Sequence, residues 1–307
     1  MSKERKGLLA GVAAYLIWGL FPLYWRSMTP ATPLELLAHR VVWAVLWVGL
    51  LLLVMRRWRE VFAVFRNRRT AWILVAASIA IGLNWGLFIY GVNAGRTIEV
   101  SLGYYINPLV SVVLGVWFFA EKLRPMQWLA LAIASIAVIV LTIEVGSFPY
   151  LGISLALSFG LYGGLKKLSP TPPMIGLMVE ALILLPAAIA LLSYLVISGK
   201  SSFGHHGIVH VILIVLMGLV TAVPLILFAV SAQSIPLSTV GLLQYLTPSM
   251  QLILGVAVFH EPMSPARWVG FAIVWTALAV FSVDALRNAR RDRRTRADEL
   301  AATADAG

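Results

Sequence analysis

The feature that most constrains this chain is the repetition of apolar runs long enough to cross a membrane. A helix that spans the roughly 30 Å hydrocarbon layer needs about 20 apolar residues, and ten nearly uncharged runs of about this length follow one another. The sequence therefore predicts an all-α integral membrane protein of ten transmembrane helices. The predicted helices cover residues 7–25, 36–55, 71–95, 100–120, 126–143, 145–165, 173–198, 207–230, 236–259 and 268–283. The polar residues and proline of 231–236 favour a turn between the eighth and ninth.

The charged residues are few and are placed like determinants of membrane topology. Only 12% of the 307 residues are charged, whereas soluble domains carry roughly 25%. With ten spans both termini share a side, and if that side is the cytoplasm, 19 of the 24 lysines and arginines lie inside, Lys166 and Lys167 among them. The four external ones are Arg26, Arg96, Lys200 and Arg267. This asymmetry predicts cytoplasmic termini and accounts for the net charge of +11 without nucleic-acid binding.

The two halves of the chain align with each other. At an offset of 140 residues Tyr105 meets Tyr245 and Pro108 meets Pro248, and the register continues to Glu121 and Glu261 without a gap. We expect five-helix repeats at 1–145 and 146–285, followed by a disordered basic cytoplasmic tail at 286–307. Because each half has an odd number of spans, the second enters the membrane from the opposite side. Inverted repeats of this kind are typical of secondary transporters that work by alternating access.

The fourth and ninth spans each carry a stripe of small and polar residues at helical spacing. Small side chains and prolines allow close helix packing, which is an alternative to a functional role for them. The polar ends of the tyrosines and glutamines need a partner or water within the membrane, which favours a substrate path. The two stripes are Ser101, Tyr104, Tyr105, Pro108, Ser111 and Gly115 in the fourth span, and Gly241, Gln244, Tyr245, Pro248, Gln251 and Gly255 in the ninth.

Only two full charges are expected well inside the spans, Arg40 in the second and Glu180 in the seventh. They are 140 residues apart, and each follows the proline that opens its span by seven residues, hence about 10 Å of helix. Because a charge in hydrocarbon is costly, each must face the protein interior or water. The pair is consistent with binding of a zwitterionic or polar substrate, with proton coupling at Glu180, or with a structural ion pair.

Aromatic and amide side chains surround these charges in the sequence. Such a set suits an aromatic-lined cavity for amphipathic solutes. The candidates are His39 and Trp43 beside Arg40, Tyr15 and Trp18 on the first span, and Asn84 and Trp85 in the third. Tryptophans near span ends are more often interfacial anchors, and this is the interpretation of Trp25, Trp58 and Trp128.

Enzymatic and metal chemistry find little support in the sequence. His205, His206 and His210 share a predicted external loop without a nearby carboxylate, so a solvated loop is favoured over a metal site. There is no cysteine, no His-Glu-x-x-His, no Gly-x-Ser-x-Gly and no phosphate-binding Gly-Lys loop. We therefore expect neither an enzyme nor a cofactor.

Several motifs resemble one known family. They are Tyr15-Leu16-Ile17-Trp18-Gly19, His39-Arg40-Val41-Val42-Trp43, Asn84-Trp85 and 101–109 (Ser-Leu-Gly-Tyr-Tyr-Ile-Asn-Pro-Leu), together with Glu180 and Gln244-Tyr245. With these motifs the chain resembles the RarD-type permeases of the drug/metabolite transporter superfamily, which have an EamA-like domain in each half. The resemblance implies a permease of the bacterial inner membrane, of a type often described as chloramphenicol-sensitive, in a superfamily that exports amino acids, metabolites and drugs. It also places Asn107 in the substrate path.

Transport is the leading prediction for function. We expect a secondary permease, most simply an exporter of small amphipathic metabolites or drugs, whose partners are the lipid bilayer and a small-molecule substrate. A non-transporting membrane scaffold or regulator is the alternative, and an intramembrane enzyme is a third class.

Overall fold

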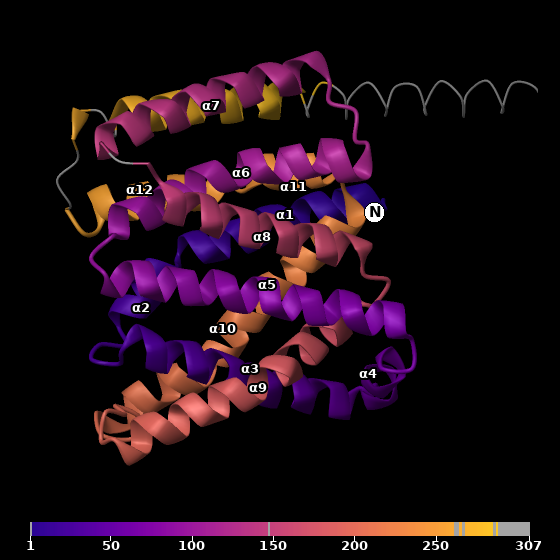
Figure 1. Ribbon diagram of the computed structural model, residues 1–307, viewed down its shortest axis with the longest axis vertical. Coiled ribbons are helices and arrows are strands. Elements are labelled where there is room, and N and C mark those ends of the chain that lie inside the picture. The colour runs from indigo at the N-terminus through magenta and orange to yellow at the C-terminus, as the bar shows by residue number, and fades with distance from the viewer. Residues whose placement is uncertain (1, 147, 261–263, 266–267, 285–286, 288–307) are drawn as a thin grey trace, which may run out of the picture. The chain divides into compact units, whose positions relative to one another are not determined.

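The computed structural model of this protein describes residues 2–146, 148–260, 264–265, 268–284 and 287. Within them the chain forms helices joined by turns, without strands. The helices are α1 (Lys3–Gly19), α2 (Phe21–Arg26), α3 (Pro33–Val54), α4 (Trp58–Val64), α5 (Arg68–Asn93), α6 (Thr97–Phe119), α7 (Pro125–Val145), α8 (Tyr150–Leu168), α9 (Pro173–Ile197), α10 (Gly207–Ser234), α11 (Leu237–Leu243) and α12 (Leu246–Ala257), followed by Trp268–Asp284 (Figure 1).

Eight segments of the described chain are long and apolar enough to cross a membrane. They correspond to eight of the ten predicted spans, with α1 and α2 counted together and α11 and α12 counted together. The sixth predicted span is α8, a 19-residue helix that is rich in glycine and ends in two lysines. The tenth is the shorter apolar helix Trp268–Asp284. The described chain is thus that of an all-helical membrane protein. Each predicted span forms a helix, but the helices differ in length and in apolar character.

Two predicted spans are interrupted where a proline follows. The first span breaks at Leu20, before Pro22, and the ninth breaks at Gln244 and Tyr245, before Pro248. Proline has no backbone N–H and its ring clashes with the carbonyl four residues earlier, so a helix is weakened at this position. The turn between Ser234 and Leu237 lies where the polar residues and Pro236 predict it.

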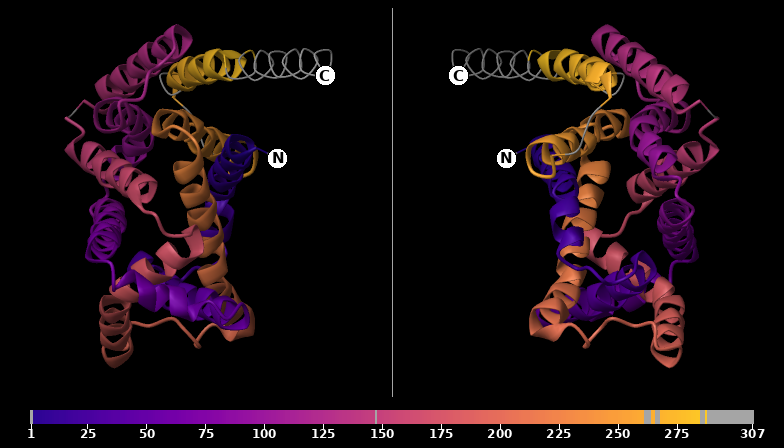
Figure 2. Two further views of the ribbon diagram at one scale, coloured as in Figure 1. Left: turned by 90° about the vertical axis from the view of Figure 1, so that its right-hand side faces the viewer. Right: turned by 90° about the vertical axis from the view of Figure 1, so that its left-hand side faces the viewer.

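The described chain divides into two compact units, Met1–Glu121 with Ser147–Pro262, and Lys122–Gly146 with Met263–Gly307. In the first unit, successive contacts form a closed ring in the order α1, α10, α3, α9, α5, α8, α6, α11 and α12, which returns to α1. Figure 2 shows α1 and α10 across from α5 and α8. In the second unit α7 packs against the helix Trp268–Asp284 through Leu141 and Gly270.

The outward faces of the spans are apolar, as a lipid environment requires. Exposed side chains include Leu53, Ile79, Leu83, Ile189 and Trp117. Without water in the bilayer core, apolar side chains can cover the outside while polar groups are satisfied within.

Some predictions fall outside the described residues. They concern most of the tail 286–307, the external Arg267, and Glu261 as the repeat partner of Glu121.

Candidate functional site

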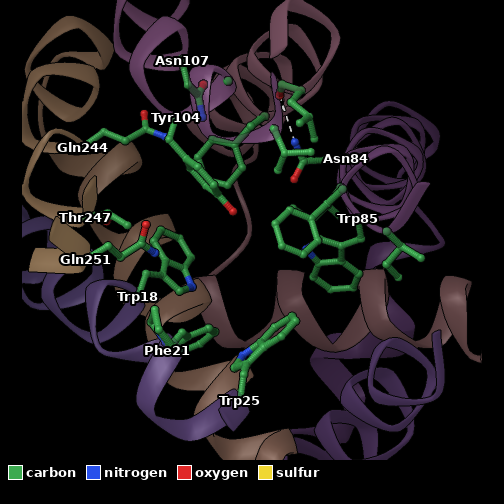
Figure 3. Close-up of a pocket in the computed structure, with 18 of the residues that line it drawn as sticks. Trp18, Phe21, Trp25, Asn84, Trp85, Tyr104, Asn107, Gln244, Thr247 and Gln251 are labelled. Carbon is green, nitrogen blue, oxygen red and sulfur yellow. Dashed lines mark hydrogen bonds between the residues drawn. The ribbon is translucent and has the colours of Figure 1, made fainter. Parts of the chain in front are cut away.

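A cavity of about 260 Å³ lies inside the ring of the first unit. Its walls come from α1, α2, α3, α5, α6, α8 and α10 and from the segment that breaks between α11 and α12. Figure 3 shows the rings of Trp18, Trp25 and Trp85 and the hydroxyl end of Tyr104 around one central space. The cavity is therefore lined mainly by aromatic side chains, with a few polar groups among them.

Nine of the residues predicted for the substrate path line this cavity. Six predicted residues, His39, Trp43, Ser101, Tyr105, Glu180 and Tyr245, do not. The nine that do are Tyr15, Trp18, Arg40, Asn84, Trp85, Tyr104, Asn107, Gln244 and Gln251.

The aromatic wall is a connected cluster. The ring centroid of Trp18 lies 5.6 Å from that of Tyr15, 5.8 Å from that of Phe159 and 5.7 Å from that of Phe228. Tilted and edge-to-face contacts at these distances are favourable for aromatic pairs. Since these rings come from α1, α8 and α10, the cluster holds three helices of the ring together at the cavity.

The polar groups of the cavity are only partly satisfied within the protein. Asn84 donates from Nδ2 to the Leu155 carbonyl at 2.9 Å and lies 3.1 Å from Ser158 Oγ. In contrast, Asn107 Oδ1 and Gln244 Oε1 are buried and have no partner among the described residues. Because an unsatisfied buried polar atom is costly, these amides are suited to meet a solute or water in the cavity.

Arg40 is the charged residue of the cavity wall. Its guanidinium carbon lies 4.3 Å from the centroid of Trp85 and 5.9 Å from that of Trp25, and the residue is 8% exposed. Among the described residues it has no ion pair and no hydrogen bond, and its Nε is buried without a partner. Two indole faces thus hold a cation that has no protein counter-ion.

Glu180 has a different partner from the one its position suggests. Its Oε1 lies 2.7 Å from Nζ of Lys166, and Tyr162 donates to its Oε2 at 3.1 Å. Lys166 is 1% exposed, so Glu180 has a buried cationic partner that its predicted pairing with Arg40 did not include. Glu180 and Arg40 do border one small second cavity of about 20 Å³.

The other predicted path residues make structural contacts. Tyr245 donates its hydroxyl to the Tyr105 carbonyl at 3.2 Å, and the exposed Ser101 donates to the Thr97 carbonyl. The ring of His39 lies 4.8 Å from that of Phe203, and the ring of Trp43 6.1 Å from the same ring. The spacing i, i+3 and i+4 identifies one side of a helix but does not fix how the helix is rotated about its axis. Residues at the edge of such a stripe can therefore face a neighbouring helix instead of the cavity.

The three histidines of 205–210 do not share one environment. His210 lies in the first turn of α10, is buried, and has Nε2 3.2 Å from the Met28 carbonyl. The prediction of a solvated loop is therefore wrong for His210. It holds for His205 and His206, which are exposed. The described residues contain no cluster of three or more metal-ligating side chains.

Several cavity residues escaped the sequence analysis. Trp25, interpreted as an interfacial anchor, lines the cavity beside Arg40. Its position seven residues after Trp18 places it on the same helical stripe, which was a usable signal. Phe159 also lines the cavity, and the offset of 141 that pairs Gly19 with Gly160 pairs it with Trp18.

Known proteins resemble this chain along nearly its whole length. The model of the EamA-like transporter family matches residues 5–143 and 149–283. Protein RarD of Streptomyces exfoliatus is 45% identical over 292 residues, which cover 95% of this chain and 93% of that protein. An uncharacterized transporter of Vibrio cholerae is 39% identical over 292 residues, covering 95% and 97%.

A solved crystal structure shares the fold at a TM-score of 0.70, with 18% identity and coverage of 89% of this chain and 96% of the other. Sequence relatives and fold agree, and both halves of the chain match one family model. The chain belongs to the EamA-like transporter family and is a RarD-type permease.

Proposed function

We propose that this membrane transporter is a secondary permease that exports small amphipathic solutes by alternating access between two inverted five-helix halves, 1–145 and 146–285. The observation that carries the proposal is the aromatic cavity enclosed by a ring of helices from both halves. An apolar cavity with a few convergent polar groups is the usual form of a site for a small organic molecule.

The order of helices in the ring supports the inverted repeat. The contacts of α10 with α1 and α3 are matched by contacts of its repeat partner α5 with α8 and α9. Repeat-related helices also contact each other directly, α3 with α9 and α6 with α11. A pseudo-twofold axis through these two contacts accounts for the whole ring, as expected for inverted-repeat transporters.

Close contacts within the ring recur at the repeat offset. A Cβ atom added at Gly19 would lie 2.6 Å from Cβ of Met250, and one added at Gly160 would lie 2.8 Å from Cγ1 of Val110. The two glycines are 141 residues apart and their partners 140. Equivalent helix pairs in the two halves therefore pack through equivalent positions.

A polar cluster joins helix ends of the ring outside the cavity lining. The Glu121 carboxylate accepts from the backbone N–H groups of Leu237 and Ser238 at 2.6 and 2.9 Å, and Lys167 Nζ lies 3.2 Å from its Oε1. Lys167 also donates to the Ile235 carbonyl at 2.9 Å. These bonds tie the start of α11 to the ends of α6 and α8.

At one end the cavity reaches the break between α1 and α2 and the start of α3, where Phe21, Trp25 and Pro33 line it. The positive-inside rule places the N-terminus, and with it the Glu121 cluster, in the cytoplasm. We therefore propose a multi-pass permease of the bacterial inner membrane whose cavity lies toward the external side of the spans.

Comparison of two tryptophan variants tests whether the cavity is the path. Extracellular and intracellular metabolites are compared in cells that express the wild type, Trp18→Ala, Trp117→Ala or no protein. Trp18 belongs to the cavity wall, whereas Trp117 is 80% exposed on the outside of α6 and is the matched control. We expect a set of solutes to accumulate outside with the wild type and Trp117→Ala, and at least ten-fold less with Trp18→Ala at equal membrane abundance.

Two outcomes would contradict the proposal. If the wild type changes no solute, the protein is better described as a membrane scaffold or regulator. If Trp18→Ala exports as well as the wild type, transport stands but this cavity is not its path.

A further inference from the structure

We propose that the transported solute carries an anionic group, such as a carboxylate, which binds Arg40, while its apolar or aromatic body lies against the tryptophan wall. The inference rests on the proposed function and adds the charge of the solute to it. It assigns the substrate class as amphipathic organic anions.

The first reason is that the cavity contains a cation without a counter-ion. Among the described residues that line it, Arg40 is the one charged side chain. The indoles of Trp25 and Trp85 stabilise the guanidinium by cation–π contact but do not neutralise its charge. A guanidinium held away from bulk water needs an acceptor with geometry that fits its planar fork, and a carboxylate fits it through two parallel hydrogen bonds.

The second reason is that the buried carboxylates of this unit are already bound elsewhere. Glu180 pairs with Lys166 and accepts from Tyr162. Glu99 pairs with Arg96, and the carboxylate of Glu35 accepts from the serines and backbone of 201–203. None of these carboxylates forms an ion pair with Arg40, which leaves the anionic group of a bound solute as the partner for its charge among the described parts of the cavity.

The third reason is the composition of the remaining wall. Besides the cation, the cavity offers aromatic rings and the unpartnered amide oxygens of Asn107 and Gln244. These oxygens accept hydrogen bonds from an amino or hydroxyl group of a solute. One anionic end, one apolar body and one donor group would together match Arg40, the aromatic wall and the amide oxygens of Asn107 and Gln244.

The solutes themselves provide the most direct test. Exported compounds are separated by electrophoretic mobility at pH 7 after expression of the wild type, Arg40→Gln, Arg40→Lys or Arg26→Gln. Arg26 is the matched control because it also lies over an aromatic ring, Phe259 at 4.8 Å, but is exposed and does not line the cavity. Membrane abundance is measured for every variant.

We expect the compounds that accumulate with the wild type to be anions. Their export should fall at least ten-fold with Arg40→Gln and be unchanged with Arg26→Gln. Arg40→Lys should retain part of it, because lysine keeps the charge but loses the bidentate fork. Accumulation of neutral or cationic compounds, equal in the wild type and Arg40→Gln, would overturn the inference and leave transport intact. If no compound moves with the wild type, the proposed function fails and the inference fails with it.

A binding measurement removes the dependence on a variant that folds poorly. The purified full-length wild type in lipid nanodiscs is titrated by calorimetry with phenylacetate, phenylacetamide and phenethylamine, which share a ring and differ in charge. Phenylacetate should bind at least ten-fold more tightly than the amide. Equal or tighter binding of the amide or the amine would contradict an anion site.

Discussion

Lys166 Nζ and Glu180 Oε1 are 2.7 Å apart, and both side chains are almost completely buried between α8 and α9. A buried pair of this kind is costly to break, because removal of one charge leaves the other without compensation. The pair thus links two helices that are consecutive in the chain but separated by α5 in the ring, and it fixes the position of the carboxylate that had been expected at the centre of the site.

Neutralising Glu180 alone should therefore destabilise the protein. We expect Glu180→Gln to lower the free energy of unfolding by about 3–5 kcal/mol, and the double variant Lys166→Met/Glu180→Gln to recover most of that loss. Thermal unfolding in detergent, followed by the monodisperse fraction in size-exclusion chromatography, measures both.

The same pair of variants tests proton coupling at Glu180. If Glu180 carries a coupling proton, the stable double variant should lose flux driven by a pH gradient and keep solute exchange in proteoliposomes. An unchanged response to the gradient in the double variant would show that the pair is structural.

Glu121 predicts a pH dependence of stability. Burial favours a higher pKa for its carboxyl, but hydrogen bonds from Ser238 and Leu237 and the charge of Lys167 outweigh burial and hold the pKa below its ordinary value. A group whose pKa is lowered in the folded state stabilises it above the unfolded pKa, and this contribution is lost as the pH falls through the folded pKa.

Glu121→Gln should thus cost about 1.5–3 kcal/mol near pH 7, and the difference from the wild type should shrink as the pH falls below about 4. Melting curves across this pH range measure the effect. Glu60→Gln is the control, because Glu60 forms its ion pair with Arg57 on an exposed helix, and its melting temperature should hardly change. A difference for Glu121→Gln that persists undiminished at low pH would contradict the assignment.

Gly218 marks the closest approach of α10 to α3. A Cβ atom there would lie 2.6 Å from the backbone N of Ala44 and closer still to the backbone of Trp43, whereas one at Gly86 would meet nothing within 4 Å. Gly218→Ala should separate the two helices and lower the melting temperature strongly, because a backbone cannot move aside as a side chain can. Gly86→Ala should leave stability unchanged or raise it by about 0.5–1 kcal/mol. Similar melting temperatures for both variants would refute the close contact.

The loop 201–203 is held by one buried carboxylate. Glu35 Oε1 accepts from the backbone N–H groups of Ser202 and Phe203 at 2.7 and 3.1 Å, and from Ser201 Oγ at 2.8 Å. Glu35→Ala should release this loop and increase hydrogen exchange at the amides of Ser202 and Phe203 at least ten-fold. Mass spectrometry of peptides that contain these amides measures the rates, and peptides from 237–243 serve as the internal control.

Much of the architecture was predictable because it depends on local composition. Long apolar runs require helices in a membrane, so the positions of the spans and the turn after Ser234 followed from the sequence. The breaks at Leu20 and at Gln244–Tyr245 were not predicted, although Pro22 and Pro248 carry the cause. Pro108 lies inside the continuous helix α6, so the presence of a proline does not by itself predict where a span is interrupted.

For the candidate site, the sequence predicted which side of a helix faces the interior, but it did not predict which individual residues of that side line the cavity. The cost of a charge in the membrane selected Arg40, the aromatic composition selected Trp18 and Trp85, and all three line the cavity. Periodicity placed Tyr104 on an inward face, and Tyr104 lines the cavity too. It placed Tyr105 beside Tyr104 with equal weight, yet Tyr105 packs away from the cavity and its carbonyl accepts from Tyr245. A rotation of one position changes a lining residue into a packing residue, because successive residues point about 100° apart on a helix.

The sequence by itself determined that this chain is a helical membrane protein, where its spans lie, and which family it resembles. Only the tertiary structure decided that Lys166 neutralises Glu180, that Arg40 lies against Trp25 and Trp85 with no counter-ion among the described residues, and that Glu121 binds the start of α11. The physical reason is whether an effect depends on the residue itself or on residues far away in the sequence. Hydropathy acts through each residue's own transfer from water, whereas a charge is satisfied by whichever partner helix packing brings within a few ångströms.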